Sequence, residues 1–391
     1  MLDLQQYMAS AITEIVATAY KNILGNPPQA LFLAQMQIAT SKAERRRKTL
    51  FEKEGINVPP FLIASIATAC NLRCKGCYAV QNGLVKGGKG LTAQQWRSIF
   101  DEADSLGISF ALLAGGEPLT RRDILEQAAQ VSGMIFPVFT NGTLINDESI
   151  KFFSQSPNII PFISIEGNEQ QTDDRRGAGI HLVVERAMDL MRKEKMFFGA
   201  SITVTSENWQ TVTDAEYLQQ LSSKGCKAVI YVEYVPAQEG TDHLVLSDEQ
   251  LKQLGATVEE RRCDCPQMIL LSFPGDEEAV GGCLAAGRGF FHINPTGKAE
   301  PCPFSPYSDT SVLEVGVKGA LSFPLPSSAN YRWPIWSAAN IMGDAPFSNI
   351  VTKWPLSCRT NSIVLYCQKL IRSSTKSVFS KYPTSSIEKH S

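Results

Sequence analysis

The sequence has few histidines, no long uninterrupted hydrophobic run and almost no net charge. With four histidines against ten cysteines, thiolates are the expected ligands of any bound metal. No segment is long enough to span a bilayer, so we expect no membrane association. The net charge of -2 gives no electrostatic reason to expect a nucleic acid partner. The N-terminal segment lacks the basic start and long apolar core of a signal peptide, so we expect a cytoplasmic protein.

Several catalytic patterns are absent as well. The chain has no recognisable Ser/His/Asp arrangement, phosphate-binding loop or pair of glycosidase carboxylates. Its composition is that of an ordinary globular protein, 43% hydrophobic and 19% charged, and its 391 residues allow one large domain or two to three smaller ones. Ten cysteines in a long intracellular chain favour metal or redox chemistry over disulfides.

The first region, residues 1–57, is predicted to be helical. Its beginning has apolar residues at helical spacing, which indicates an amphipathic helix. These residues are Leu4, Met8, Ile12, Ile15, Ala19 and Ile23. A second helical stretch carries the basic run KAERRRK at 42–48. We interpret that run as a solvated helix face, and a docking surface for an acidic partner is the alternative.

The second region, residues 58–240, alternates short apolar runs with amphipathic stretches. Helices are predicted to begin near residues 92, 121, 147, 179 and 211. Strands are predicted at 61–67, 108–114, 134–140, 159–165, 197–205 and 228–235. Strands that alternate with helices predict a parallel sheet with right-handed crossovers, either doubly wound or a barrel.

Chemically unusual residues follow four of these strands in turn. A cysteine triplet follows the first strand, and GGEP at 115–118 follows the second. TNGT at 140–143 follows the third strand, and SIEG at 164–167 ends the fourth. In parallel α/β folds, ligands bind at the carboxyl ends of the strands. We therefore expect one shared site at this end of the sheet.

The triplet consists of Cys70, Cys74 and Cys77, in the stretch ACNLRCKGCYA at 69–79. A lone zinc ion normally requires a fourth protein ligand nearby, and no second CxxC or His pair lies at a finger-like distance. A cubane iron–sulfur cluster held by three cysteines leaves one iron free, where a substrate or cosubstrate can bind. A structural zinc site with a remote ligand and an accidental clustering of cysteines are the alternatives.

CNLRCKGCYA resembles the CxxxCxxC signature of the radical S-adenosylmethionine (radical SAM) enzymes, and the resemblance covers about residues 61–236. It implies a partial (β/α)6 barrel in which Cys70, Cys74 and Cys77 hold a [4Fe-4S] cluster. S-adenosylmethionine would chelate the free iron and be cleaved reductively to a 5′-deoxyadenosyl radical that abstracts hydrogen from a substrate. An aromatic residue often precedes the third cysteine of this family, whereas this chain has Gly76.

The same resemblance implies roles for residues at the other strand ends. Gly115 and Gly116 would let the backbone approach the cosubstrate, and Glu117 would help to hold the methionyl ammonium. Ser164 and Glu166 would bond the ribose hydroxyls, and Arg176 in TDDRRGAG would pair with the methionyl carboxylate. A turn role for GGEP, a capping or turn role for Ser164 and Glu166, and a surface position for Arg176 are the alternatives. Thr140, Asn141, Asn208 and Val235 are weaker candidates.

The third region, residues 241–320, lacks the helix and strand alternation. Cys283, Gly297 and Cys302 match the Cx(9-15)Gx4C opening of the SPASM and twitch extensions, which implies an auxiliary iron–sulfur cluster held by Cys283 and Cys302. The surrounding sequence predicts a β-hairpin with a turn at 295–297. Cys263 and Cys265 could complete four thiolates, although the rest of the SPASM array is missing. Two buried or zinc-bound cysteines are the alternative.

After residue 320 the composition changes, since serine and proline become frequent and acidic residues nearly vanish. We interpret residues 321–391 as an atypical tail, either disordered or the product of a disrupted reading frame.

The favoured function is a radical SAM enzyme that acts on a peptide or a cofactor precursor and takes electrons from a reductant such as flavodoxin or ferredoxin. A tetrapyrrole or other small-molecule maturase of the same superfamily is the first alternative. A non-catalytic iron–sulfur or zinc-binding protein is the second.

Overall fold

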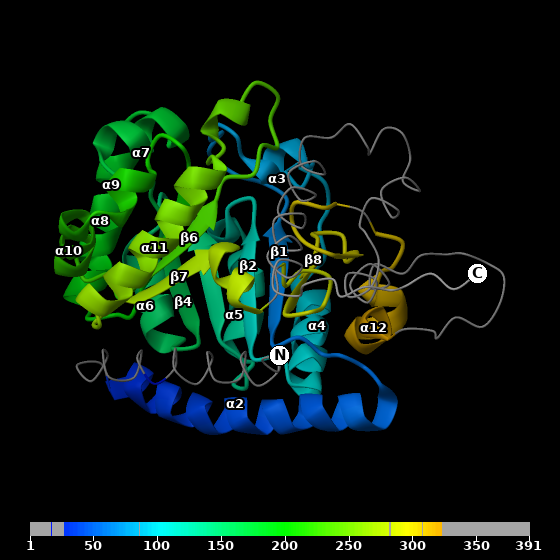
Figure 1. The fold of residues 1–391 in the computed structure, drawn as a ribbon. Helices are drawn as coiled ribbons and strands as arrows, with labels where there is room; N and C mark the ends of the chain where they lie inside the picture. Colours follow the sequence, from blue (N-terminus) through cyan, green and yellow to red (C-terminus); the bar gives the residue numbers. More distant parts are fainter. Residues whose placement is uncertain (1–16, 18–26, 86, 281–282, 307, 323–391) are drawn as a thin grey trace, which may run out of the picture.

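A nine-stranded sheet organises the computed structural model, which describes residues 17, 27–85, 87–280, 283–306 and 308–322. All six predicted strands are present, and each is parallel to its neighbour. They are β1 (Phe61–Ala67), β2 (Phe110–Gly115), β3 (Phe136–Thr140), β4 (Ile159–Ser164), β5 (Gly199–Val204) and β6 (Ala228–Glu233). The sheet is open and curved, which is the partial-barrel architecture expected from the sequence (Figure 1).

Helices connect these strands close to the predicted positions. They are α3 (Tyr78–Gln81), α4 (Ala93–Leu106), α5 (Arg122–Ala129), α6 (Asp147–Gln155), α7 (Glu169–Arg176), α8 (Ile180–Lys193), α9 (Trp209–Thr213) and α10 (Ala215–Ser223). Local sequence explains their starts. The Thr92 hydroxyl and Gln95 form a capping box at the beginning of α4, and Asn146 and Ser149 do the same for α6.

The third region corrects one expectation, because the alternation continues into it. Helix α11 (Asp248–Asp264) is followed by β7 (Ile269–Phe273), which pairs in parallel with β6. The predicted hairpin is confirmed as β8 (Phe290–Ile293) and β9 (Ala299–Glu300); β8 lies parallel to β1, and β9 is the outermost strand on that side of the sheet. The sheet therefore crosses the boundary expected at residue 240.

Three shorter 3-10 segments and one last helix complete the described elements. The segments are η1 (Pro118–Arg121), η2 (Asp242–Leu244) and η3 (Gly275–Val280), and α12 (Val312–Leu321) packs against α4. Two predictions fall outside the described residues: the apolar pattern between Leu4 and Ile23, and the tail beyond residue 322. None of the described helices combines the length and apolar character of a membrane span.

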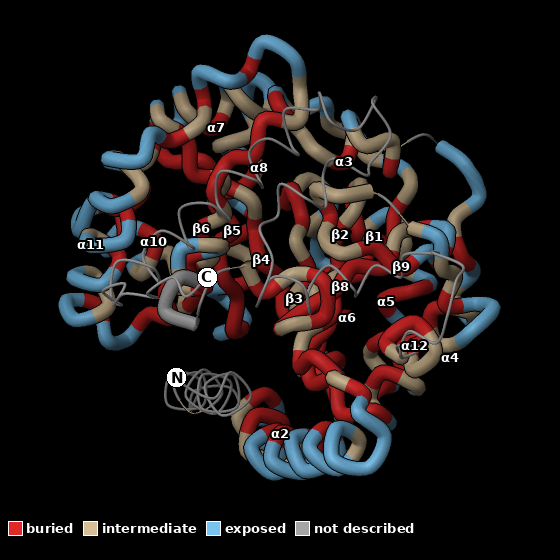
Figure 2. The backbone as a smooth tube through the Cα atoms, turned by 45° about the vertical axis from the view of Figure 1, so that its right-hand side comes forward, coloured by how far each residue is buried: buried red, intermediate tan, exposed pale blue. Residues whose placement is uncertain are grey.

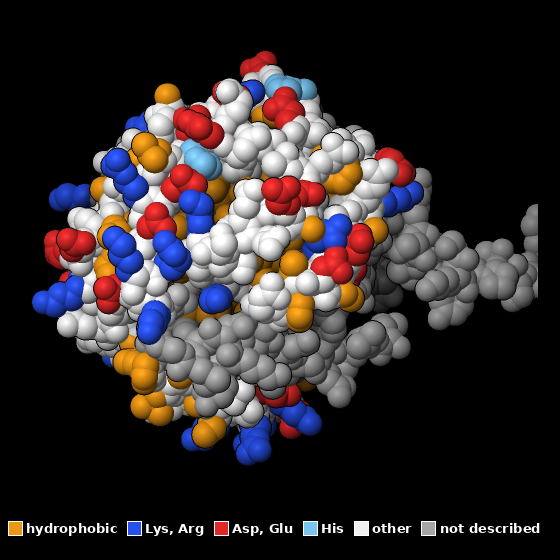
Figure 3. Space-filling view, turned by 90° about the vertical axis from the view of Figure 1, so that its left-hand side faces the viewer, with side chains coloured by type: hydrophobic (Ala, Val, Ile, Leu, Met, Phe, Trp, Pro, Cys, Tyr) orange, Lys and Arg blue, Asp and Glu red, His pale blue; other side chains and the backbone are white. Residues whose placement is uncertain are grey.

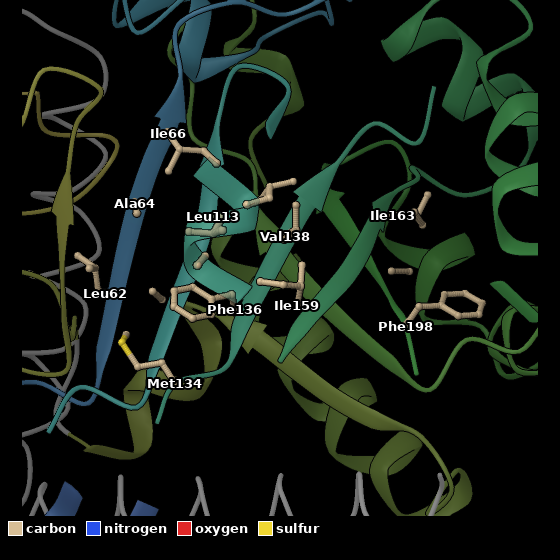
Figure 4. Packing of buried hydrophobic residues seen from close by; sticks show 14 of the residues in the cluster. Leu62, Ala64, Ile66, Leu113, Met134, Phe136, Val138, Ile159, Ile163 and Phe198 are labelled. Carbon is tan, nitrogen blue, oxygen red and sulfur yellow. The ribbon is translucent and has the colours of Figure 1, made fainter. Parts of the chain in front are cut away.

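The main hydrophobic core lies between the sheet and the helices that follow its strands. Alternate strand residues such as Leu62, Leu113, Val138 and Ile163 point into it, and Figure 4 shows how these side chains line up across neighbouring strands. Trp96 and Phe100 of α4 are fully buried and stack with ring centroids 5.5 Å apart. Each such buried side chain contributes about 1.5–3 kcal/mol relative to an exposed one.

Helix α2 (Pro27–Glu54) covers the opposite end of the sheet from the strand ends where we expect the site (Figure 1). Its residues Phe32, Leu33 and Met36 pack with residues at the beginnings of the strands, including Phe110 and Ile160. Its other side is exposed to solvent, as Figure 2 shows. The N-terminal region that is described therefore leaves the carboxyl ends of the strands uncovered.

The basic run on α2 is mainly the solvated face that the sequence predicts. Lys42, Arg45, Arg46 and Lys48 are exposed. Arg47 is the exception, because it is 6% exposed and its guanidinium donates to the carbonyl of Gly107 at 2.5 Å. Burial lowers the pKa of Arg47 to about 10. Elsewhere on the surface, basic, acidic and hydrophobic side chains are interspersed, as on the face in Figure 3.

Candidate functional site

The loop after β1 brings the three cysteines of the triplet into one neighbourhood. Cys70, Cys74 and Cys77 are half-buried and form no disulfide. Burial raises the pKa of the Cys70 thiol, and negative charge on Glu117, Cys74 and Cys77 raises it further. These groups therefore lie close enough to repel one another when ionised. Iron would supply the compensating positive charge, and three thiolates are a donor set that suits an iron–sulfur cluster.

The cysteine loop alternates thiols with solvated side chains. Asn71, Arg73 and Lys75 are exposed, while the three cysteines between and beside them are less so. The backbone N–H of Cys77 donates to the carbonyl of Cys74 at 3.3 Å, and helix α3 begins directly after Cys77. This local turn sets the separation of Cys74 and Cys77 along the loop.

Gly115 and Gly116 are required by the close approach of the chain after β1. A Cβ atom at Gly115 would lie 2.9 Å from the carbonyl oxygen of Ala67, and one at Gly116 would lie 2.0 Å from that of Ala69. The N–H groups of Gly116 and Glu117 donate to the same two carbonyls at 2.9 and 2.8 Å. Both glycines therefore fix the start of the cysteine loop to the end of β2.

Glu117 is 1% exposed, and hydrogen bonds hold both of its carboxylate oxygens. One oxygen accepts from the N–H of Leu119 at 3.0 Å and the hydroxyl of Thr140 at 2.7 Å. The other accepts from the N–H of Asn141 at 2.8 Å. Burial raises the pKa of Glu117, although these bonds and Arg176 act to lower it. The carboxylate thus joins the ends of β2 and β3 beneath the cysteine loop.

Asn141 lies nearer to the triplet than its turn-like TNGT sequence suggests. Its amide nitrogen donates to Asn71 Oδ1 at 2.9 Å and lies 3.9 Å from Cys70 Sγ. Its Oδ1 accepts from the N–H and hydroxyl of Thr143, so the turn and the sulfur contact belong to one arrangement. Hydrogen bonds to cysteine sulfur are one of the ways in which a protein tunes an iron–sulfur cluster.

Glu166 is a buried carboxylate that pairs with two arginines of α7. Its Oε1 accepts from Arg175 Nη1 at 2.6 Å and from Arg176 Nε and Nη2 at 2.9 and 2.5 Å. Its Oε2 accepts from the N–H of Thr203 at 3.1 Å. Glu166 is 1% exposed, and the Arg175 and Arg176 side chains are 15% and 9% exposed. The surface alternative for Arg176 is therefore wrong.

Arg176 also lies beside the triplet. Burial acts to lower its pKa, but Glu166 and the thiols of Cys74 and Cys77 outweigh burial and raise the pKa above its ordinary value. A permanent positive charge at this position favours ionised thiols and attracts an anionic group of a ligand. Arg176 was named from the sequence, and Arg175 was missed. Because the two are adjacent arginines, the sequence offered no means of choosing between them.

The remaining strand-end candidates differ in how they are used. Ser164 is half-buried at the end of β4. Asn208 is buried, and its amide donates to the carbonyls of Glu166 and Thr203 at 3.0 Å each, so it supports the strand ends. Val235 packs in a small apolar cluster after β6. These last two residues hold neighbouring segments in place.

A cavity of about 450 Å³ opens beside Cys74. Its lining includes Arg73, Cys74, Lys75, Arg175, Arg176 and Gln238. The Nε atom of Arg175 is buried and has no hydrogen-bond partner in the described part of the chain. The cavity therefore carries more positive than negative charge close to the second cysteine.

Two further residues in contact with the cysteine loop were not anticipated. Gln238 Oε1 accepts from the N–H of Gly76 at 2.8 Å, and the Tyr234 ring packs directly on Gly76. Both come from the segment after β6, more than 150 residues from the triplet in sequence. The glycine at 76 is the one local signal that something must approach closely there.

The third-region cysteines lie in separate surroundings. Cys302 packs beside Leu284 and Phe290, and the Ala286 N–H donates to the carbonyl of Pro301 at 3.0 Å, which joins the two loops. Cys283 hydrogen-bonds Glu277, a carboxyl whose pKa burial raises to about 7. Cys265 belongs to the main core, and Cys263 is exposed. Cys358 and Cys367 lie outside the described residues.

Across the described ranges, no three His, Cys, Asp or Glu side chains lie close enough together to hold one metal ion. This finding concerns single-ion sites such as zinc, because the ligands of a cubane attach to separate irons and need not meet at one point.

Comparisons with known proteins match this chain to one family. Residues 64–218 match the family model described as the Radical SAM superfamily. The chain is 28% identical over 288 residues to an AdoMet-dependent heme synthase of Methanosarcina barkeri, covering 66% of this chain and 80% of that protein. It is 25% identical over 256 residues to a PqqA peptide cyclase of Granulibacter bethesdensis, covering 63% of this chain and 68% of the relative.

A solved structure supports the architecture. The crystal structure of Streptococcus suis SuiB bound to S-adenosylmethionine superposes with a TM-score of 0.58 at 15% identity, over 76% of this chain and 70% of SuiB. At that identity the likeness concerns the fold, and it agrees with the open parallel sheet described above.

Proposed function

Because this chain is a radical S-adenosylmethionine enzyme whose family domain spans residues 64–218, we propose that Cys70, Cys74 and Cys77 hold a [4Fe-4S] cluster with S-adenosylmethionine beside it. The observation that carries the proposal is that the three thiols share the loop after β1, where Asn141 Nδ2 lies 3.9 Å from Cys70 Sγ and Arg176 lines a cavity together with Cys74. When bound, this pair supplies reductive cleavage of the sulfonium to a 5′-deoxyadenosyl radical that takes hydrogen from a substrate.

The chain's own residues bind and orient the cosubstrate in this proposal. Arg176, held by Glu166, receives the methionyl carboxylate. Glu117 receives the methionyl ammonium, since a carboxylate has about four acceptor positions and the described bonds use three. Ser164 faces the ribose together with Glu166, whose main work is to position the two arginines. Gly115 and Gly116 keep the backbone close to the site.

We propose a peptide or a peptide-derived cofactor precursor as the substrate. Relatives named PqqA peptide cyclase and mycofactocin maturase MftC support this class, at 25% and 27% identity. A tetrapyrrole substrate is the second candidate, supported by relatives named AdoMet-dependent heme synthase and Fe-coproporphyrin III synthase at 28% and 24% identity. In either case the electron comes from a reductant such as flavodoxin or ferredoxin.

A smaller proposal concerns the third region, where Cys283 and Cys302 supply two ligands of an auxiliary iron–sulfur cluster. The contact between their loops supports it. The described residues provide only these two thiols in that neighbourhood, because Cys263 is exposed and Cys265 belongs to the main core. The test measures iron per chain in a variant with Cys70, Cys74 and Cys77 all replaced by alanine. Iron that this variant retains, and that the additional substitution Cys283→Ser removes, supports the second cluster. If the triple alanine variant retains no iron, the second cluster is overturned.

The main test is anaerobic reconstitution with iron and sulfide, followed by S-adenosylmethionine and dithionite. Release of 5′-deoxyadenosine is expected from the natural chain and not from the triple alanine variant. No release from protein with its cluster shown intact would overturn the enzymatic proposal and leave a non-catalytic iron–sulfur protein. Candidate peptides and tetrapyrroles added separately should then raise the release, and the class that does so identifies the substrate.

A further inference from the structure

Close to Cys77, three segments that are distant in sequence hydrogen-bond the chain between Lys75 and Asn82. The N–H of Lys75 donates to the carbonyl of Arg175 at 2.8 Å, and the amide of Asn82 donates to the carbonyl of Pro303 at 3.0 Å. Both contacts end on backbone carbonyls, which any residue at 175 or 303 would supply. The third contact, from the segment after β6, depends on particular side chains.

Gln238 makes the hydrogen bond of this third contact. Its Oε1 accepts from the N–H of Gly76, the residue before Cys77, at 2.8 Å. A backbone N–H that is shielded from water and has no hydrogen-bond acceptor destabilises the fold. The acceptor for the Gly76 N–H is a side chain, and not a backbone carbonyl of a helix or sheet. Loss of that acceptor would release the peptide next to the third cysteine.

Tyr234 makes the packing contact. A Cβ atom at Gly76 would lie 2.3 Å from Tyr234 Oη and 2.7 Å from its Cε2, so the phenol ring occupies the space of any side chain there. Gly76 also has a φ of +71°, a conformation that glycine adopts without strain. Tyr234 is 2% exposed, so its ring is fixed in place.

Thr241 ties these two residues together. The Tyr234 hydroxyl donates to Thr241 Oγ1 at 2.7 Å, and Thr241 Oγ1 donates to the carbonyl of Gln238. The ring that packs on Gly76 and the amide that bonds it therefore form one connected unit. Thr241 is 3% exposed, so water does not compete freely for these bonds.

We propose that Tyr234, Gln238 and Thr241, the β6 clamp, are positioning residues that fix the Gly76–Cys77 peptide and so determine how firmly Cys77 holds iron. The inference rests on the proposed function, because it takes Cys77 as a cluster ligand. Residues that orient a ligand are energetically important, and their loss typically lowers metal affinity by about 10–100-fold. The clamp contacts the loop at Gly76, through the hydrogen bond to its N–H and the packing of the Tyr234 ring on its Cα.

The test measures cluster retention instead of turnover. Gln238→Ala, Gln238→Glu and Tyr234→Phe are reconstituted anaerobically beside the natural chain, and the rate of cluster loss to an iron chelator is followed by absorbance. Tyr231→Phe is the matched control, because Tyr231 lies on β6 just before the clamp segment and donates to the carbonyl of Val212 at 2.9 Å instead of contacting Gly76. Thermal unfolding of each apoprotein separates cluster effects from general stability.

We expect Gln238→Ala to lose its cluster at least about tenfold faster than the natural chain. Gln238→Glu keeps an acceptor for the Gly76 N–H and should retain the cluster nearly as well as the natural chain. Tyr234→Phe keeps the ring and should lose the cluster only a few times faster. Tyr231→Phe should lower the unfolding temperature without accelerating cluster loss.

The clamp is overturned if Gln238→Ala and Tyr234→Phe lose the cluster no faster than Tyr231→Phe. It is also overturned if Gln238→Glu behaves like Gln238→Ala, since the acceptor oxygen would then be irrelevant. If the natural chain takes up no cluster at Cys70, Cys74 and Cys77, the proposed function has failed and the clamp falls with it. If the natural chain takes up the cluster and the clamp variants lose it no faster than the natural chain does, the clamp is refuted and the proposed function stands.

Discussion

The cysteine loop after β1 and the cysteine pair of the third region show two different ways of placing thiols. Cys70, Cys74 and Cys77 lie in one turn at the end of a parallel strand, next to the ends of β2, β3 and β4. Cys283 and Cys302 lie on two loops that meet at one backbone hydrogen bond, beside the Leu284–Phe290 cluster. The first group is surrounded by polar strand-end residues, while in the second group Cys302 packs against apolar residues and Cys283 hydrogen-bonds Glu277.

The difference shows what parallel βα repetition provides. Strands β1 to β6 are parallel, so their carboxyl ends all lie at the same end of the sheet. Polar residues that follow different strands are therefore brought close together by the fold itself. The third region joins the same sheet, but β8 and β9 form a hairpin at its edge. Its cysteines therefore depend on loop packing for their position.

The largest expected effect contrasts the two cysteine groups directly. Cys74→Ala should reduce 5′-deoxyadenosine release to background, because the core cluster loses a ligand. Cys302→Ala should keep that release within about tenfold of the natural chain. Cys263→Ser, at an exposed position on α11, is the control and should change nothing. Equal loss in Cys74→Ala and Cys302→Ala would contradict the comparison.

The second prediction concerns the buried charges of the core site. Glu166→Gln leaves Arg175 and Arg176 without their carboxylate, and removing one partner of a buried pair costs about 3–5 kcal/mol. Asp189→Asn breaks a pair whose side chains are 46% and 53% exposed, which is worth about 0–1 kcal/mol. Urea unfolding of both apoproteins measures the two decreases in the free energy of unfolding. Similar decreases in both variants would mean that leaving the buried arginines without their carboxylate does not destabilise the fold.

The third prediction tests the seam between the core and the third region. His292 on β8 is fully buried, and its ring nitrogens contact Ser65 Oγ at 2.8 Å and Glu300 Oε2 at 2.7 Å. His292→Ala leaves both partners without this contact, at a cost of about 2–3 kcal/mol. His243→Ala, at an exposed histidine, is the control. Calorimetric unfolding that finds the two variants equally stable would show that the seam adds little.

The smallest expected effect comes from Asn82, which joins α3 to the third region. In Asn82→Asp the new side chain has nearly the same shape but cannot donate to the carbonyl of Pro303. Its free energy of unfolding should therefore fall by about 0.5–1.5 kcal/mol. Asn82→Ala should lose a similar amount, which chemical denaturation can measure. A loss from Asn82→Ala alone would point to packing and not to the hydrogen bond.

Sequence patterns predicted the core well because they are local. Apolar runs of strand length gave all six strands to within a few residues, and PTG at 295–297 gave the β8–β9 hairpin. The loss of alternation expected after residue 241 is wrong. Helix α11 was missed because its amphipathic pattern is weak, with only two of its residues, Leu254 and Val258, buried. Burial of the following strand, β7, then depends on packing that no local window contains.

The candidate site was predicted in its residue types more than in its contacts. The triplet, Glu117, Glu166 and Arg176 were named as candidates because each follows a predicted strand or lies in a recognisable motif. The proximity of Asn141 to Cys70 could not be read from TNGT, which is first a turn sequence. Arg175 had no feature to distinguish it from Arg176, although both reach the same carboxylate oxygen.

By itself, the sequence determined which strands exist, in what order they alternate with helices, and hence which loops share the carboxyl edge of the sheet. Those properties follow from hydrophobic periodicity and from the handedness of βα crossovers, which act over short stretches of chain. Only the tertiary structure decided that Glu166 neutralises two arginines, that β8 lies beside β1, and that Tyr234 fills the space over Gly76. Such contacts join residues distant in sequence, and close packing selects them only after the sheet has formed.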